Sequence, residues 1–470
     1  MKKLIICALT IALAACSATK KTANSGAASA SDVAFWLTKG DRSALLEKQN
    51  TALNFGTAQN NNPTIVIDET QKFQSIDGFG YTLTGGSAGL INAMDAQAQD
   101  ALLQDLFSAK NNGIGISYLR ISIGASDMSA DTFTYNELPA GQTDINQDKF
   151  SITKEMGALI PLLKKIIAIQ PDIKILGSPW TAPTWMKTNN SFKGGSLKPE
   201  YYQSYATYLV KYIRAMKAQG ITIDAITIQN EPLHPGNVPS MYMEAKDQAV
   251  FIKTALGPLF KSSGIKTKII LYDHNADRPD YPLTILNDAE AKPYVDGSAF
   301  HLYAGKIDAL TTVHDAHPDK NLYFTEQWVG GPGKFDEDLK WHVSTLIIGA
   351  TRNWSRNVLE WNLAADPNYG PHTVGGCVTC LGAITISPAV TRNVAWYIIG
   401  HASKFVRPGS VRIASNITND LQNVAFTTPE GKTVLIVANG NRTEQSFNIK
   451  SKGKIVTATL PGGAVGTFVW

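Results

Sequence analysis

Two glutamates in this 470-residue chain end apolar, strand-like runs. Glu231 closes the run IDAITIQNEP, and Glu326 closes the run NLYFTEQW. Carboxyl groups paired at strand ends can cleave a glycosidic bond. One protonates the leaving oxygen, and the other attacks from the opposite face of the sugar or activates water there. The two glutamates therefore predict glycoside hydrolysis.

Polar and aromatic side chains also stand at the ends of the neighbouring strand-like runs. Tryptophan rings can stack on the apolar faces of sugars, while carboxylates, amides, histidines and arginines can bind sugar hydroxyls. Singly, each has a plain structural explanation, since Asn-Glu-Pro is a common turn and a lone tryptophan or histidine often packs in a core. Their repetition at successive strand ends instead predicts one sugar-binding site. Besides the glutamates, these residues are Arg120, Ser122, Ser126, Asp127, Trp180, Trp185, Asn230, Tyr272, Asp273, His274, Asn275, His301, Tyr303, Trp328, Trp361 and Asn362.

The elements that would position these side chains alternate between strand-like and helix-like runs. Nearly continuous apolar strands predict parallel pairing, and eight of them separated by amphipathic helices predict an α/β fold, a (β/α)8 TIM barrel. The predicted strands are 75–83, 118–125, 173–180, 221–231, 268–275, 296–303, 321–326 and 357–363. The predicted helices include 154–169, 201–219, 244–260, 338–351 and 391–405.

The pattern of apolar residues changes after Pro408. Short apolar runs separated by Gly, Asn and Pro predict antiparallel strands at 410–417, 422–429, 432–440, 445–450, 454–460 and 466–470. Runs 32–38 and 63–69 are expected to join the same layer, so that both ends of the chain build a side β-sandwich. The predicted domains are N-terminal strands in 32–72, the barrel in 73–405 and the C-terminal sandwich in 406–470.

The first 31 residues are predicted to precede the fold. A positive start is followed by an apolar stretch too short to span a bilayer, and Leu13-Ala14-Ala15-Cys16 resembles a bacterial lipoprotein box. We expect residues 1–16 to be a lipoprotein signal peptide with a lipid on Cys16, the alternative being an ordinary secretory leader. The small polar residues 17–31 predict a flexible tether.

This leader predicts a protein of the bacterial cell envelope that is anchored by lipid and does not span the membrane. Ser17 stands where an inner-membrane retention signal would have aspartate, so the outer membrane is expected. No acidic cluster follows Cys16, which favours the periplasmic face over the cell surface. We expect a monomer.

The charge of the chain bears on its binding partners, and its cysteines bear on a disulfide. The net charge of +4 falls to +2 without the two leader lysines, and no Lys- or Arg-rich block is present, so nucleic acid is not an expected partner. Of the four cysteines, Cys7 leaves with the leader and Cys16 takes the lipid. Cys377 and Cys380 are expected to form a short-loop disulfide, with a redox switch as the alternative.

No metal or cofactor is predicted. Asp273, His274 and His301 match no metal-binding spacing. The glycine-rich run DGFGYTLTGG lacks the G-x-G-x-x-G spacing that binds dinucleotides.

Seven segments, in order along the chain, resemble glycoside hydrolase family 30: DGFGYTLTGGSA, YLRISIGASDMS, SPWTAPTWMKTN, IQNEP, FHLYAG, FTEQW and EWNLA. That family includes the lysosomal glucosylceramidase and bacterial and fungal β-1,6-glucanases, and the resemblance covers nearly all of the mature chain. It implies a barrel with a side β-domain and a retaining mechanism. It also implies that Glu231 is the acid/base and Glu326 the nucleophile.

The resemblance also assigns the residues around the glutamates. Asp127, Trp180, Asn230 and Trp361 look like the family's residues around the sugar in the first subsite. Arg120, His301 and Tyr303 look like supports for the carboxylates, and His301, Tyr303 and Trp328 are also expected to reach the substrate. The mechanism requires a raised pKa for Glu231 and a normal or lowered pKa for Glu326, which Arg120 would favour from beneath.

Departures from the glucosylceramidase branch bear on the substrate. FHLYAG has Leu302 where that branch usually carries tryptophan, and Trp328 follows the nucleophile as a bulky platform. GGCVTCLGAITI resembles the β-1,6-glucanase branch more closely. We expect an endo-β-1,6-glucanase. The alternative is a glucosylceramidase-like exo-β-glucosidase or another exo-β-glycosidase. A more distant one is a non-catalytic glycan-binding lipoprotein, which would be expected to lose one carboxylate.

Overall fold

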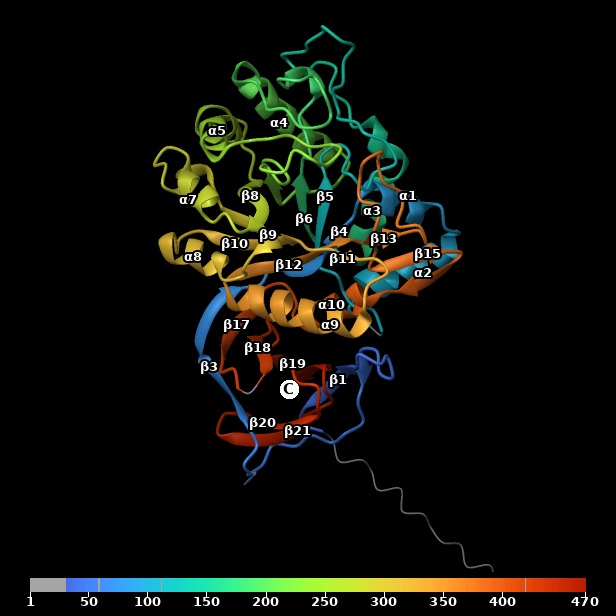
Figure 1. Cartoon of the computed structure of the whole chain (residues 1–470), viewed down its shortest axis with the longest axis vertical. Helices are drawn as coiled ribbons and strands as arrows, with labels where there is room; N and C mark the ends of the chain where they lie inside the picture. The colour runs from blue at the N-terminus through green and yellow to red at the C-terminus, as the bar shows by residue number, and fades with distance from the viewer. Residues whose placement is uncertain (1–30, 58–59, 111, 419) are drawn as a thin grey trace, which may run out of the picture.

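The structure is a computed structural model that describes residues 31–57, 60–110, 112–418 and 420–470 (Figure 1). The predicted signal peptide with Cys16, and the predicted tether except Ser31, lie outside the described residues. Within these ranges, none of the helices combines the length and the hydrophobicity that crossing a bilayer would require.

Eight parallel strands close into a barrel, which confirms the predicted fold class. Each strand overlaps one of the predicted runs, because continuous apolar sequence suits a strand that is covered on both faces. Around the barrel they are β10 (Asn321–Glu326), β12 (Ser355–Asn362), β4 (Gly78–Thr82), β5 (Tyr118–Ser122), β6 (Lys174–Ser178), β7 (Ala225–Thr227), β8 (Lys268–Ala276) and β9 (Gly297–Gly305).

Helices cover the outside of the barrel and turn apolar stripes toward it. In α3 (Leu159–Ile169) the stripe is Leu159, Leu162, Leu163 and Ile166, at the spacing of one helix face. This helix begins later than predicted, after a 3-10 turn at Thr153–Gly157, and Pro161 lies in its first turn, where a missing N–H costs nothing.

The remaining helices are α1 (Gly85–Asn92), α2 (Ala96–Phe107), α4 (Tyr202–Ala218), α5 (Ala245–Phe251), α6 (Gly257–Ser262), α7 (Asp280–Leu286), α8 (Ala309–Ala316), α9 (Phe335–His342) and α10 (Val394–Ser403). Two of them continue into π-helical segments, Ile252–Leu256 after α5 and Val343–Ala350 after α9.

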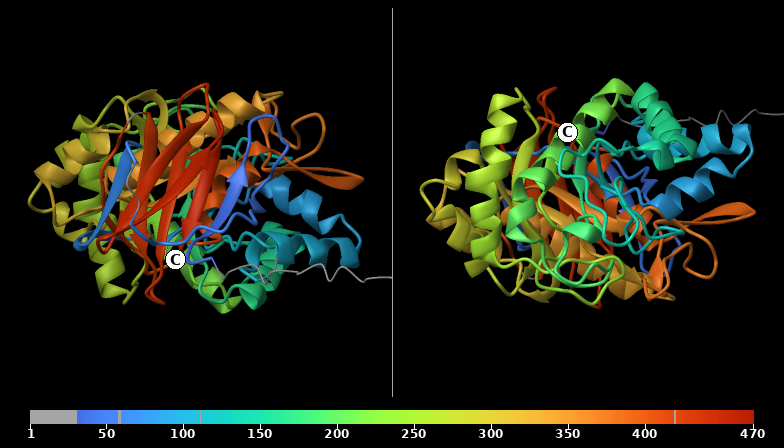
Figure 2. Two further views of the ribbon diagram at one scale, coloured as in Figure 1. Left: turned by 90° about the horizontal axis from the view of Figure 1, so that it is seen from below. Right: turned by 90° about the horizontal axis from the view of Figure 1, so that it is seen from above.

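A nine-stranded mixed sheet packs beside the barrel, and both ends of the chain build it as predicted. In the left view of Figure 2, blue N-terminal strands lie alongside the red C-terminal ones. The order is β2 (Glu47–Lys48), β1 (Ala34–Thr38), β22 (Val465–Val469), β19 (Thr433–Asn439), β18 (Leu421–Thr427), β17 (Val411–Ser415), β3 (Thr64–Ser75), β20 (Gln445–Ser451) and β21 (Lys454–Leu460).

The pairing in this sheet departs from the prediction at one place. β20 runs parallel to β3, whereas the other neighbouring strands of the sheet pair antiparallel. No hairpin joins β3 to β20, because the whole barrel lies between them in the chain, so hairpin geometry does not constrain their relative direction. The sheet has its own apolar core, which includes Phe35, Ile65, Leu435, Phe447 and Phe468.

Candidate active site

The inside of the barrel carries an apolar layer with a polar layer above it. Buried apolar side chains form the lower layer: Tyr118, Leu176, Ala225, Ile270, Ala299, Tyr323 and Leu359. Because every second residue of a strand points to the same face, residues two positions further along also face inward. On six strands these residues are Arg120, Ser178, Thr227, His301, Thr325 and Trp361. The period of the strands thus places the site above the apolar layer.

Strand β8 interrupts this period. Its pairing with β9 shifts register between Tyr272 and His274, and both Tyr272 and Asp273 have positive φ, at 69° and 62°. The irregularity turns the Tyr272 ring onto Tyr281 and Phe300, while Asp273 enters the polar layer. Such bulges re-aim side chains next to functional sites.

Arg120 lies at the centre of the polar layer and is fully buried. Its Nη1 donates to Glu326 Oε2 at 2.5 Å, and its Nη2 donates to Asp273 Oδ2 at 2.8 Å and to Asn230 Oδ1 at 2.6 Å. Its Nε donates to Ser178 Oγ at 3.1 Å. One guanidinium therefore connects side chains from β5, β6, β8, β10 and the end of β7, with the directional hydrogen bonds that make arginine suited to buried carboxylates.

Asp273 is the second buried residue that links several strands through hydrogen bonds. Its Oδ1 accepts hydrogen bonds from His301 Nε2 at 3.1 Å and Thr325 Oγ1 at 2.6 Å, and its Oδ2 accepts one from Thr227 Oγ1 at 2.7 Å in addition to that from Arg120. Burial alone would raise its pKa, but Arg120 and His301 hold the pKa of Asp273 far below its usual range.

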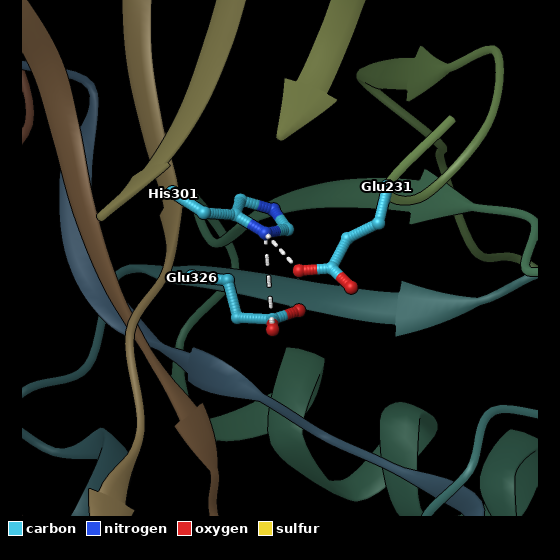
Figure 3. A group of neighbouring side chains, drawn as sticks. All are labelled: Glu231, His301 and Glu326. Carbon is cyan, nitrogen blue, oxygen red and sulfur yellow. Dashed lines mark hydrogen bonds and ion pairs between the residues drawn. The ribbon is translucent and has the colours of Figure 1, made fainter. Parts of the chain in front are cut away.

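The carboxylates of the two glutamates approach each other, and both face the Nδ1 atom of His301 (Figure 3). Glu326 accepts from Arg120 and, through Oε1, from the Tyr303 hydroxyl at 2.9 Å. Glu231 has a positive φ of 45°, and its backbone N–H donates to the Asp273 carbonyl at 3.0 Å. Carboxylate oxygens of the two glutamates lie within 4.8 Å of each other, closer than the 6.5–9.5 Å typical of inverting enzymes.

His301 is fully buried and contacts both glutamates. Its Nδ1 is 3.2 Å from Glu231 Oε1 and 3.8 Å from Glu326 Oε1. Burial would lower the pKa of the imidazole, but the charge of Glu326 and the hydrogen bonds to Asp273 and Glu231 raise it to about 9. At neutral pH both ring nitrogens therefore carry protons and donate to carboxylates.

The pKa directions of the glutamates are the reverse of those predicted. Burial tends to raise the pKa of Glu231, but the hydrogen bond and charge of His301 lower it below its ordinary value. For Glu326, burial outweighs His301 and Arg120 and raises the pKa. The prediction was wrong because it did not place an imidazolium against Glu231.

A pocket of about 310 Å³ opens above the glutamates. Asp127, Trp180, Asn230, Tyr303, Trp328 and Trp361 line it, as the sequence analysis expects of substrate-binding residues. Arg120 and His301 are absent from its wall because they lie fully buried beneath it. His301 thus occupies the supporting position and not the substrate-contacting one.

The tryptophans form the apolar part of the wall. The rings of Trp180 and Trp361 lie 5.5 Å apart, and Trp180 also stacks over the Arg120 guanidinium at 4.7 Å. Trp180 Nε1 is buried and has no hydrogen-bond partner among the described residues. Asp127 has a pKa raised to about 7, first by burial and then by repulsion from the two glutamates.

Two pocket residues, His234 and Asn237, were not predicted from the sequence. His234 and Asn237 follow Glu231 in the loop after β7, where the strand-end argument does not reach. His274 and Asn275 stand at the end of β8, and the sequence analysis named both among the strand-end candidates. Burial lowers the pKa of His274 to about 4, so its ring is neutral and can bind hydroxyls.

Among the residues that the structure describes, one set of groups could surround a cation, namely Glu231, His301 and Glu326. A protonated imidazole has no free lone pair for a metal, and the pKa of about 9 keeps His301 protonated at neutral pH. Arg120 already provides a positive charge to Glu326. This chemistry suits proton transfer and nucleophilic attack better than metal binding.

Cys377 and Cys380 are joined by a disulfide, and both line the pocket. They belong to the segment after β12, whose short strand β14 (Cys380–Leu381) pairs with β11 (Val329–Gly330). The disulfide is therefore at the site and not in a remote surface loop.

Comparison with known proteins agrees with this geometry. Residues 76–406 match the glycosyl hydrolase family 30 TIM-barrel domain, and residues 409–468 match the family's beta sandwich domain. The endo-1,6-beta-D-glucanase of Neurospora crassa is 35% identical over 429 residues, 86% of this chain and 88% of the relative. The lysosomal acid glucosylceramidase of Mus musculus is 30% identical over 436 residues, 86% and 83% of the two chains. A solved structure, the endo-beta1,6-glucanase BT3312, superposes with a TM-score of 0.86 at 36% identity, covering 94% of this chain and 99% of that one.

Proposed function

Because this chain belongs to glycoside hydrolase family 30, a family of retaining glycosidases, we propose that it is an endo-acting β-1,6-glucanase. One observation supports the β-1,6 linkage of the proposed substrate. Two relatives named as endo-β-1,6-glucanases, one of them a solved structure, match nearly the whole chain at 35% and 36% identity. Leu302 and Trp328, which depart from the glucosylceramidase branch, support the same choice.

The proposed reaction is a double displacement. Glu231 protonates the glycosidic oxygen while ionised Glu326 attacks the anomeric carbon and forms a covalent glycosyl-enzyme. Glu231 then removes a proton from water, which releases the sugar with its configuration retained. The short separation of the carboxylate oxygens supports direct attack, since it leaves no room for the water that an inverting enzyme places between them.

His301 supplies the proton for the first step in this proposal. The resting arrangement, with imidazolium and two carboxylates, contains the same number of protons as the productive one, in which Glu231 is protonated and His301 is neutral. The two differ by one transfer along the 3.2 Å hydrogen bond from Nδ1 to Oε1. Glu231 can therefore act as the acid although His301 lowers its pKa.

Asn230 and Asp127 would hold the sugar in the first subsite. Arg120 donates to Asn230 Oδ1, so the Asn230 amide nitrogen is the group left to donate to a hydroxyl beside the reacting carbon. A hydrogen bond there strengthens in the transition state. Trp180 and Trp361 would pack against the apolar face of the ring.

Product analysis tests the proposed function. The purified protein is incubated with a β-1,6-glucan, and with β-1,3-glucan, xylan and an aryl β-glucoside in parallel. We expect short β-1,6 oligosaccharides to appear early from the β-1,6-glucan. The β-1,3-glucan and the xylan should not be cleaved. The Glu326→Ala variant is the control for contaminating activity, and it should release nothing.

Release of glucose from the aryl glucoside alone would contradict the proposal. It would favour the second candidate, a glucosylceramidase-like exo-β-glucosidase, which the 30% identity with the mouse glucosylceramidase supports.

A further inference from the structure

The segment 371–381 closes one side of the pocket, and its disulfide is part of the wall. Cys380 is buried in one cluster with Met128, Trp180 and Trp361, and Cys377 packs against this cluster together with Trp328. The two cysteines thus pack in the same cluster as the tryptophans that would receive the sugar ring.

The same segment holds Asp127. The backbone N–H of Cys377 faces the Asp127 carboxyl group and tends to lower its pKa, and Thr373 N donates to the Asp127 backbone carbonyl at 2.8 Å. Gly376 lies so close that an added Cβ would be 2.3 Å from that carbonyl oxygen. The orientation of the Asp127 carboxyl therefore depends on where residues 373–377 are placed.

The far end of the disulfide loop is held as well. Cys380 is paired with Gly330 in the β11–β14 ladder, and Gly331 N donates to the Thr379 carbonyl at 2.8 Å. This ladder directly follows Trp328. The disulfide therefore connects the backbone that contacts Asp127 to the backbone that carries Trp328.

We infer that the Cys377–Cys380 disulfide is a positioning element of the first sugar subsite, which keeps the Cys377 N–H against the Asp127 carboxylate and thereby sets the affinity for the sugar. The inference rests on the proposed role of Asp127 and does not depend on the linkage that is cut. The ring closes over a separation of only three residues, and short loops gain little stability from a cross-link. A purely stabilising disulfide would act on the unfolding temperature and leave KM unchanged.

The experiment compares the full-length wild type with the double variant Cys377→Ser, Cys380→Ser, using an aryl β-glucoside so that linkage preference does not enter. We expect KM to rise about tenfold, as the loss of one polar contact with the Asp127 carboxyl group would produce, with kcat within about twofold. Val378→Ala is the matched control, because Val378 lies in the same loop, is 61% exposed and leaves both cysteines in place.

A double-mutant cycle with Asp127→Asn shows whether the disulfide acts through Asp127. Asp127→Asn alone should raise KM, and the serine substitutions should then change KM by less than about twofold further. Equal increases in both backgrounds would overturn the inference, as would an unchanged KM in a folded double-serine variant. If Asp127→Asn has no effect on KM, the premise about Asp127 fails, while the product analysis above still decides the function.

Reduction of the wild type provides a second route if the serine variant does not fold. Dithiothreitol cleaves the S–S bond to two thiols and is itself oxidised to a cyclic disulfide. With two thiols released per chain and an unchanged circular dichroism spectrum, KM should rise as in the variant. An unchanged KM in this reduced, folded protein would contradict the inference.

Discussion

The imidazole of His301 donates from Nδ1 to Glu231 at 3.2 Å and from Nε2 to Asp273 at 3.1 Å. At the scale of single residues, these two bonds determine which group holds the acid proton. A neutral ring could donate to only one of the carboxylates, so both bonds together favour the charged form. Glu231 and His301 then titrate as a pair that shares one proton.

The shared proton predicts the alkaline limb of activity. In the wild type, kcat/KM should fall as the pH rises through about 9, where the pair loses this proton. In His301→Gln the proton belongs to Glu231 alone, so the limb should move to lower pH by at least about one unit. The pH profile with an aryl β-glucoside checks this, with His314→Gln on α8 as a control. If the alkaline limb of kcat/KM stays at the same pH in His301→Gln, the acid proton is not shared with His301.

Glu231 should matter most when the leaving group needs a proton. For Glu231→Ala we expect kcat/KM on β-1,6-glucan to fall by about 10²–10⁴, the usual contribution of a general acid. The first step with a dinitrophenyl β-glucoside should change little, because that leaving group departs as an anion. Pre-steady-state release of dinitrophenol measures it. A loss of similar size on both substrates would argue against the acid role.

At the scale of elements, the two-residue period of the strands directs most side chains of the polar layer into the barrel. The bulge in β8 directs Asp273 there. Arg120, Thr227 and Thr325 could be predicted to face inward, since each lies two residues beyond the apolar layer. Asp273 could not, because strict alternation would have pointed Tyr272 inward and Asp273 outward. The bulge in β8 depends on contacts with β9 that are distant in sequence. His234 and Asn237 could not be predicted either, because they lie in the loop after β7, where no strand period applies.

Asp273 should therefore contribute to stability as well as to activity. Asp273→Asn leaves Arg120 and His301 without the negative charge between them, and we expect the free energy of unfolding to fall by about 3 kcal/mol. Asp277→Asn, at an exposed position just past the same strand, should have little effect. Urea unfolding compares the two variants at neutral pH. Equal stability of both would mean that the network does not need this charge.

At the scale of the whole molecule, the barrel and the mixed sheet form one body through α10. His401 on this helix contacts Thr467 Oγ1 at 2.9 Å and Thr38 Oγ1 at 2.8 Å, so one buried side chain touches strands from both ends of the chain. Both layers could be predicted from the sequence, because the short apolar runs separated by Gly, Asn and Pro after Pro408 are a local sequence pattern. The parallel pairing of β20 with β3 joins residues far apart in the chain, and no local pattern encodes it.

The measurement that tests the catalytic account most directly is trapping of the glycosyl-enzyme. A 2-deoxy-2-fluoro-β-glucoside with a dinitrophenolate leaving group should inactivate the protein. Fluorine slows both steps, and the activated leaving group speeds only the formation of the glycosyl-enzyme, so this intermediate accumulates. Tryptic digestion places Glu326 in residues 321–334, where it is the only carboxylate, and Glu231 in residues 218–246. We expect the label on Glu326. A label on residues 218–246, or turnover without any trapped intermediate, would contradict Glu326 as the nucleophile.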